Sequence, residues 1–136
     1  MISFTNITQL SATYFQDSSL DYIPEVIFDE TNGIIKISGE SYHEYAVEFF
    51  QPICDWLISY INEYPRKKIT LEFRMTYFNT STSRRFLEIF KQLEAHSQIG
   101  GNVEVNWYYE SHDLDMLESG YEYGSVLSFD FNLLPY

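Results

Sequence analysis

The chain of 136 residues has the length of a single domain, and its 45% hydrophobic content, with 18% aromatic residues, is enough for one continuous core. Eight Lys and Arg stand against 20 Asp and Glu, and the resulting formal charge of -12 repels nucleic-acid phosphates and anionic lipid headgroups. We therefore expect residues 1–136 to form one domain, with an irregular lead-in over 1–22 whose role is open. Nucleic acid and membrane insertion are excluded as partners.

The single cysteine, Cys54, excludes an intramolecular disulfide framework. The first residues lack the basic segment and apolar run of a secretory signal, and no apolar stretch is long enough to span a bilayer. A cytoplasmic location is the default expectation for such a chain.

The first half of the sequence predicts a hairpin and then a helix. Two β-rich runs, 26–28 and 34–38, flank the turn-forming pair Asn32-Gly33, which indicates an antiparallel hairpin. Residues 44–64 carry apolar side chains at helical spacing. Since Pro52 lacks the amide proton that a helix interior needs, we expect either a kink there or a separate turn before it.

The second half alternates strands with helices. We predict a strand over 69–77, a helix over 83–96, a strand through 103–107, one or two helical turns within the acidic segment 110–122, and a last strand over 126–131. Such alternation implies parallel strands joined by helical crossovers. The expected fold is α/β, with a mixed sheet that opens with a hairpin. Alternation within 69–77 predicts one apolar face that holds Ile69, Leu71, Phe73, Met75 and Tyr77.

Nothing in these elements indicates an enzyme, a metal site or a bound cofactor. Cys54 lies on the apolar stripe of the first helix, which favours core packing over nucleophilic chemistry. The three histidines lie in separate segments without the paired spacing of a zinc site. Asp113, Asp115 and Glu118 lack the pattern of a calcium-binding loop, so we expect a solvated acidic surface there.

The stretch "YFNTSTSRRF", residues 77–86, places five small polar residues before a helix. Capping of the helix explains one of them, at about 1 kcal/mol, but no Glu or Gln completes a capping box with the others. Phosphorylation is the other interpretation, because a phosphate there would face free amides and the positive end of the helix dipole. Arg84 and Arg85 add positive charge nearby. Composition alone favours capping.

Several segments, among them "PEVIFDETNGIIKISGESYHEY", "PICDWLISYI", "YFNTSTS", "VNWYYESHDLDMLESG" and "FNLLPY", together resemble the SiaC family of bacterial regulatory phosphoproteins. The resemblance implies a STAS-like fold and a function in partner switching. A cognate kinase phosphorylates a threonine of the Asn-Thr-Ser motif, a PP2C-like phosphatase removes the phosphate, and the unphosphorylated form binds an effector such as a diguanylate cyclase. Carried over by motif, the threonine is Thr80.

The expected partner-binding site consists of the residues that flank this phosphosite. The family often has Pro and Asn where this chain has His43 and Tyr45, which puts partner choice in question. One alternative is a constitutive adaptor in which the run only caps a helix. A remoter alternative is a small-ligand binder that uses the aromatic side chains Tyr42, Tyr77 and Phe78. The expected partner-binding site comprises Asn79, Ser81, Ser83, Tyr77, Phe78, Glu40, Ser41 and Tyr42.

Overall fold

The computed structural model describes residues 4–6, 24–42 and 46–136. The lead-in outside 4–6, together with His43 and Tyr45, lies outside the described residues. In chain order the elements are β1 (Phe4–Asn6), β2 (Glu25–Asp29), β3 (Ile34–Ser41), α2 (Ala46–Glu63), β4 (Ile69–Phe78), α3 (Thr80–Gln98), β5 (Val103–Tyr109), α4 (Leu114–Ser125) and β6 (Asp130–Pro135).

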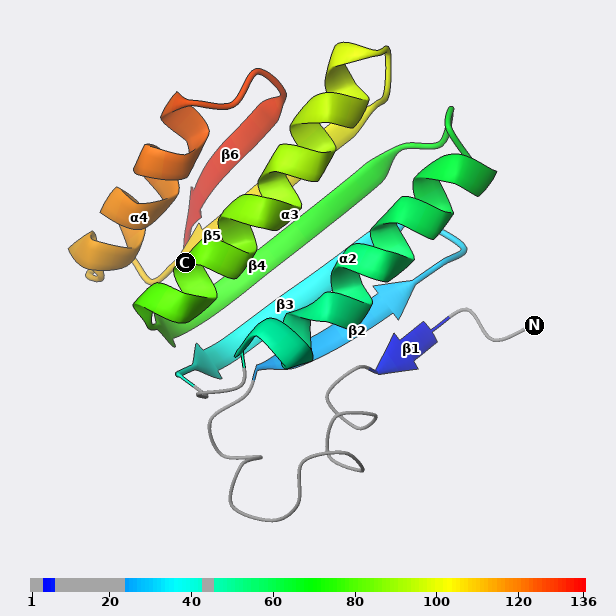
Figure 1. Cartoon of the computed structure of the whole chain (residues 1–136). Helices are drawn as coiled ribbons and strands as arrows, with labels where there is room; N and C mark the ends of the chain where they lie inside the picture. Colours follow the sequence, from blue (N-terminus) through cyan, green and yellow to red (C-terminus); the bar gives the residue numbers. More distant parts are fainter. Residues whose placement is uncertain (1–3, 7–23, 43–45) are drawn as a thin grey trace.

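The six strands form one sheet in sequence order, from β1 to β6. Strands β1, β2 and β3 pair antiparallel, whereas β3 to β6 pair parallel. Helices α2, α3 and α4 connect the parallel strands and lie on one face of the sheet (Figure 1). This follows from topology, because right-handed crossovers that step in one direction along a sheet place their helices on the same face. The predicted α/β fold, with a mixed sheet that opens with a hairpin, is confirmed.

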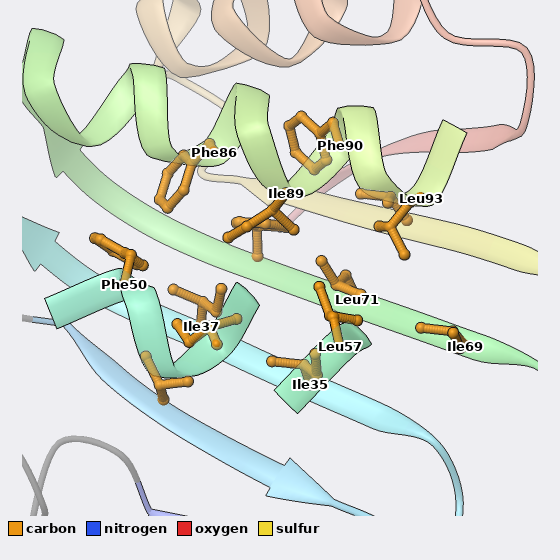
Figure 2. Close-up of a cluster of buried hydrophobic side chains, with 14 of the residues drawn as sticks. Ile35, Ile37, Phe50, Leu57, Ile69, Leu71, Phe86, Ile89, Phe90 and Leu93 are labelled. Atoms are coloured by element: carbon orange, nitrogen blue, oxygen red, sulfur yellow. The ribbon is translucent and has the colours of Figure 1, made fainter. Parts of the chain in front are cut away.

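The core lies between this helical layer and the sheet. Figure 2 shows side chains of α2 and α3 that meet side chains of β3 and β4. Cys54 is buried in this core, as the apolar stripe predicted. The residues labelled in the figure are all fully or almost fully buried: Ile35, Ile37, Phe50, Leu57, Ile69, Leu71, Phe86, Ile89, Phe90 and Leu93.

Helix α2 is continuous from Ala46 through Pro52, so the alternative of a separate turn before the proline is wrong. Helix α3 begins at Thr80, three residues before the predicted start, because Asn79 caps it. Strand β6 begins at Asp130 rather than 126. Val126 instead closes α4, with its amide directed to the carbonyls of Tyr123 and Gly124.

Helix α4 is longer than the predicted one or two turns, since it spans 12 residues. Its inner side packs on the sheet through Met116 and Gly120, both buried. Gly120 lies against the Trp107 indole, where a Cβ would overlap the ring. The Trp107 Nε1–H donates to the Met116 carbonyl oxygen at 3.0 Å. The acidic residues of the segment therefore form the outer side of a packed helix.

A β-bulge at the end of β4 overturns the prediction that Tyr77 shares the core face with Met75. Gly39 pairs with Met75, but the next residue of β3, Glu40, pairs with Tyr77, so Thr76 is extra. One extra residue reverses the facing of those that follow. Tyr77 is consequently 51% exposed.

Candidate functional site

The predicted site residues gather at one edge of the sheet. There the parallel strands β3 to β6 end and helices α2, α3 and α4 begin (Figure 1). Such an edge is the usual location of binding sites in α/β proteins. The ends of β3 and β4 are hydrogen-bonded neighbours, with Glu40 opposite Tyr77 and Ser41 opposite Phe78. Helix α3 starts two residues after β4 ends, so Thr80 lies beside this pair of strand ends.

Asn79 is the N-cap of α3. Its backbone is extended, and its side-chain Oδ1 accepts a hydrogen bond from the Thr82 amide at 2.9 Å. The Asn79 amide donates to the Ser41 carbonyl oxygen at 3.0 Å, which fixes the cap to the end of β3. Thr80 is therefore the first residue of the helix, and it is exposed.

A buried hydroxyl pair fixes the first turn of α3 to β3. Ser41 Oγ and Thr82 Oγ1 are 2.7 Å apart, and both residues are buried from solvent. The Thr82 hydroxyl also lies 3.3 Å from the Ser41 carbonyl oxygen. Because buried hydroxyls need partners, this mutual satisfaction explains why a serine and a threonine are placed in the interior here.

A second hydroxyl pair fixes the same turn to α4. The Tyr123 hydroxyl donates to the Ser83 carbonyl oxygen at 2.9 Å, and Ser83 Oγ lies 2.7 Å from the same Tyr123 oxygen. Burial raises the pKa of Tyr123 to about 12, against the opposing effect of the Ser83 hydroxyl. The phenol thus stays protonated and acts as a donor at all physiological pH values.

These contacts correct the expectation that capping leaves most of the polar run unexplained. Asn79, Thr82 and Ser83 each have a structural partner. Within the described part of the chain, the side chains of Thr80 and Ser81 make no hydrogen bond, and Thr80 is the more exposed of the two. The hydroxyl that the family resemblance selects is thus one that the fold leaves accessible.

Two tyrosines form an exposed aromatic pair next to Thr80. Tyr42 and Tyr77 are 39% and 51% exposed, and their ring centroids lie 5.5 Å apart in an edge-to-face arrangement. Phe78 instead packs inward on Phe86 and Trp107, at centroid distances of 5.2 Å and 5.8 Å. Tyr77 and Phe78 both line the pocket described below, but Tyr42 is not among its lining residues, and the exposed pair fits a protein contact better.

A pocket of about 220 Å³ lies beside the pair, between the end of β4 and the start of α4. Among the described residues, two carboxylates line it and no basic side chain does. Asp113 caps α4 by accepting from the Met116 amide at 3.0 Å, and Asp115 lies in the first turn. The lining residues are Thr76, Tyr77, Phe78, Asp113, Asp115, Met116 and Ser119.

Besides Tyr77 and Phe78, which were predicted, the site contains residues that were not: Thr82, Tyr123 and the pocket residues Thr76, Asp113, Asp115, Met116 and Ser119. Asp113 is of a residue type favoured at helix N-caps, and Asp115 adds an acidic residue to the first turn, which together are a local signal for the start of α4. No local signal links Ser41 to Thr82 or Ser83 to Tyr123, because about 40 residues separate the members of each pair.

Two further findings concern the described residues as a whole. None of their helices is long and apolar enough to cross a membrane. None of their His, Cys, Asp and Glu side chains form a group of three that could hold a metal ion.

Known proteins resemble this chain in sequence. The profile of the SiaC family of regulatory phosphoproteins matches residues 15–136. An uncharacterised protein of Pseudomonas aeruginosa strain UCBPP-PA14 is 29% identical over 108 residues, which cover 79% of this chain and 85% of that protein.

Solved structures of SiaC from Pseudomonas aeruginosa resemble the chain along most of its length. The crystal structure of apo-SiaC has a TM-score of 0.80 at 27% identity and covers 84% of this chain and 92% of its own. The crystal structure of the diguanylate cyclase SiaD in complex with its activator SiaC gives a TM-score of 0.82 at 27% identity, with coverage of 85% and 94%.

Proposed function

This chain belongs to the SiaC family of regulatory phosphoproteins, and from that premise we propose that it is a non-enzymatic signalling protein whose binding to an effector is switched at Thr80. One observation carries the proposal. Thr80 presents an exposed hydroxyl at the first position of α3, while the neighbouring Asn79, Thr82 and Ser83 are occupied by structural contacts.

The proposed cycle has three partners. A cognate protein kinase phosphorylates Thr80, a PP2C-like phosphatase removes the phosphate, and the unphosphorylated form binds the effector. Pseudomonas aeruginosa SiaC is the activator of a diguanylate cyclase, which supports an effector of the same class here. The proposed effector surface contains the exposed pair Tyr42 and Tyr77 with the flanking Glu40 and Ser81.

Release on phosphorylation must be a local effect. A chain that already carries a charge of -12 would attract a basic partner more strongly if more negative charge were added. A phosphate on Thr80 would instead add charge to a contact surface whose member Tyr77 also lines the pocket with Asp113 and Asp115. A complete switch takes about 5.5 kcal/mol of differential affinity, and burial of a phosphate against an effector surface that offers it no cation costs several kcal/mol.

Two measurements test the switch. Intact-mass analysis of the chain from its native cells should show one added phosphate that maps to Thr80. Calorimetry with each purified diguanylate cyclase of the same organism should then show binding by the unmodified protein and by Thr80→Ala. Protein with phosphothreonine incorporated at position 80 should bind far more weakly. Thr80→Asp, with less charge and bulk than a phosphate, should weaken binding only partly.

Ser81→Ala is the matched control for the site of modification. Because Ser81 belongs to the proposed effector surface, the control compares effector affinity with and without a phosphate on Thr80, and loss of the adjacent hydroxyl should leave that ratio unchanged. The constitutive-adaptor alternative makes the opposite prediction for the modified protein. If an effector binds the phosphorylated and unmodified forms equally well, Thr80 is not the switch and the run serves only to start α3.

A further inference from the structure

Arg84 is an exposed cation without a partner. Among the residues that the structure describes, it forms no ion pair, hydrogen bond or ring contact. The adjacent Arg85 differs, because its side chain is only 20% exposed and its Nη1 lies 3.2 Å from Glu88 Oε1. Glu88 is the carboxylate one turn beyond Arg84, so its pairing with Arg85 leaves Arg84 uncompensated.

Arg84 lies one helical turn after Thr80. Residues four apart on a helix are neighbours, with Cβ atoms about 5–6 Å from each other. The favourable order for such a pair has the acidic group nearer the helix N-terminus and the basic group after it. A phosphate on Thr80 with a guanidinium at position 84 has that order. Guanidinium also pairs with phosphate through two parallel hydrogen bonds.

We propose that Arg84 is the intramolecular partner that holds a phosphate on Thr80, an inference that rests on the proposed function. Arg84 lies one turn after Thr80 on the same helix, so its attraction acts on the phosphate within α3.

The arrangement also favours Thr80 over Ser81 as the phosphorylated residue. A phosphate on Ser81 would have Arg85 four residues later, and Arg85 is already paired with Glu88. Thr80 thus has an unpaired arginine at the favourable spacing, and Ser81 has an occupied one.

The test uses the full chain with phosphothreonine incorporated at position 80, so it requires neither kinase nor effector. A ³¹P NMR titration measures the second pKa of the phosphate, which is about 6 for an unperturbed phosphothreonine. Since Arg84 stabilises the dianion, Arg84→Gln should raise this pKa by about 0.3 to 0.7 unit. Arg84→Lys, which keeps the charge, should raise it less.

Lys91→Gln is the matched control. Lys91 is an exposed cation on the same helix, also without an ion pair among the described residues, and it lies about 16 Å from Thr80 along the helix axis. That distance exceeds the Debye length of about 8–10 Å, so its removal should shift the pKa by less than about 0.1 unit. Equal shifts for Arg84→Gln and Lys91→Gln would overturn the proposal.

The result is independent of whether Thr80 is modified in the cell. Absence of a phosphate in the native protein would contradict the proposed function, whereas the titration concerns only the contact between positions 80 and 84. If Arg84→Gln gives the expected pKa shift but protein from native cells carries no phosphate, the proposed function is wrong. If native protein carries a phosphate on Thr80 but Arg84→Gln gives no shift, the proposed contact with Arg84 is wrong.

Discussion

Helices α3 and α4 begin at the same edge of the sheet with the same type of capping hydrogen bond but with different charge. Asn79 Oδ1 accepts from the Thr82 amide at 2.9 Å, and Asp113 Oδ1 accepts from the Met116 amide at 3.0 Å. The cap of α4 is a carboxylate, and Asp115 follows in its first turn. The first turn of α3 contains no acidic residue.

The difference in charge between the two helix starts bears on the proposed switch. Negative charge near a helix N-terminus is favourable, by about 0.3–1 kcal/mol at an exposed site. Helix α4 carries this charge permanently. Helix α3 has a neutral cap and an exposed hydroxyl at Thr80 instead, so the same favourable charge could be added and removed there by phosphorylation.

The largest expected effect concerns the residue whose amide is capped in each helix. Met116 is an apolar core residue, so Met116→Ala should lower the free energy of unfolding by about 2–5 kcal/mol. Thr82→Val leaves Ser41 Oγ buried without its hydroxyl partner and should cost about 1–3 kcal/mol. Urea unfolding measures both. Thr82→Ser is the control, and a loss from it as large as from Thr82→Val would show that the hydroxyl pair is not what stabilises the turn.

The link between the two helices should weaken at high pH. The folded-state pKa of Tyr123 is about 12, against about 10 when unfolded, so its contribution is present below pH 10 and is lost as pH rises toward 12. Two pH units correspond to about 2–3 kcal/mol. The stability difference between the parent protein and Tyr123→Phe should therefore change over pH 10–12. A difference that stays constant over that range would contradict the buried position of this phenol.

Exchange of the caps should shift stability in opposite directions. Asn79→Asp adds a charge to the start of α3 and should raise the free energy of unfolding by about 0.3–1 kcal/mol, whereas Asp113→Asn should lower it by a similar amount. Both changes should shrink in 1 M NaCl. Changes of the same sign in thermal unfolding would mean that the surroundings of the caps, rather than the helix dipoles, set their energetics.

Phosphorylation of Thr80 should leave the fold intact. A dianion at the first position of α3 should stabilise the exposed helix start by about 0.3–1 kcal/mol rather than melt it. Thermal unfolding of protein with and without phosphothreonine at position 80 measures the change, and Thr80→Ala serves as the uncharged control. A large loss of melting temperature would contradict the comparison with α4.

The smallest expected effect is that of divalent cations. Asp113 and Asp115 at the start of α4 serve as a cap and as solvated charge, so millimolar calcium or magnesium should change the melting temperature little. Association with a basic effector surface should nevertheless slow as salt is raised. Strong, saturable stabilisation by either cation would show that these carboxylates form a metal site.

Local patterns predicted the order of the elements and the fold class, because the periods of the strands and helices are properties of short segments. The prediction failed at Tyr77, since the bulge depends on how Gly39 and Glu40 of the neighbouring strand pair with β4. The acidic segment forms a helix of three turns, longer than predicted. Its length was missed because few residues of its inner side are apolar or buried: Met116, Gly120 and Tyr123.

The candidate site was predictable only in part. Asn79 as a cap follows from local rules, and the family resemblance selects Thr80. The roles of Thr82 and Ser83 were not predictable, because their partners lie about 40 residues away and meet them only in the folded chain. The unpaired state of Arg84 was likewise not predictable, because Glu88 is within reach of both Arg84 and Arg85 on the helix and pairs with Arg85 in the structure.

The extra residue in β4 changes the alternation of side chains at the end of the strand. Up to Met75 the side chains follow the order that the core requires, and after Thr76 the outward position passes to Tyr77 while Phe78 turns inward. Deletion of Thr76 would remove the bulge and leave a regularly alternating strand in which Tyr77 still faces outward and Phe78 still faces inward. The bulge therefore accommodates one more residue at this strand end without turning Tyr77 into the core or Phe78 out of it.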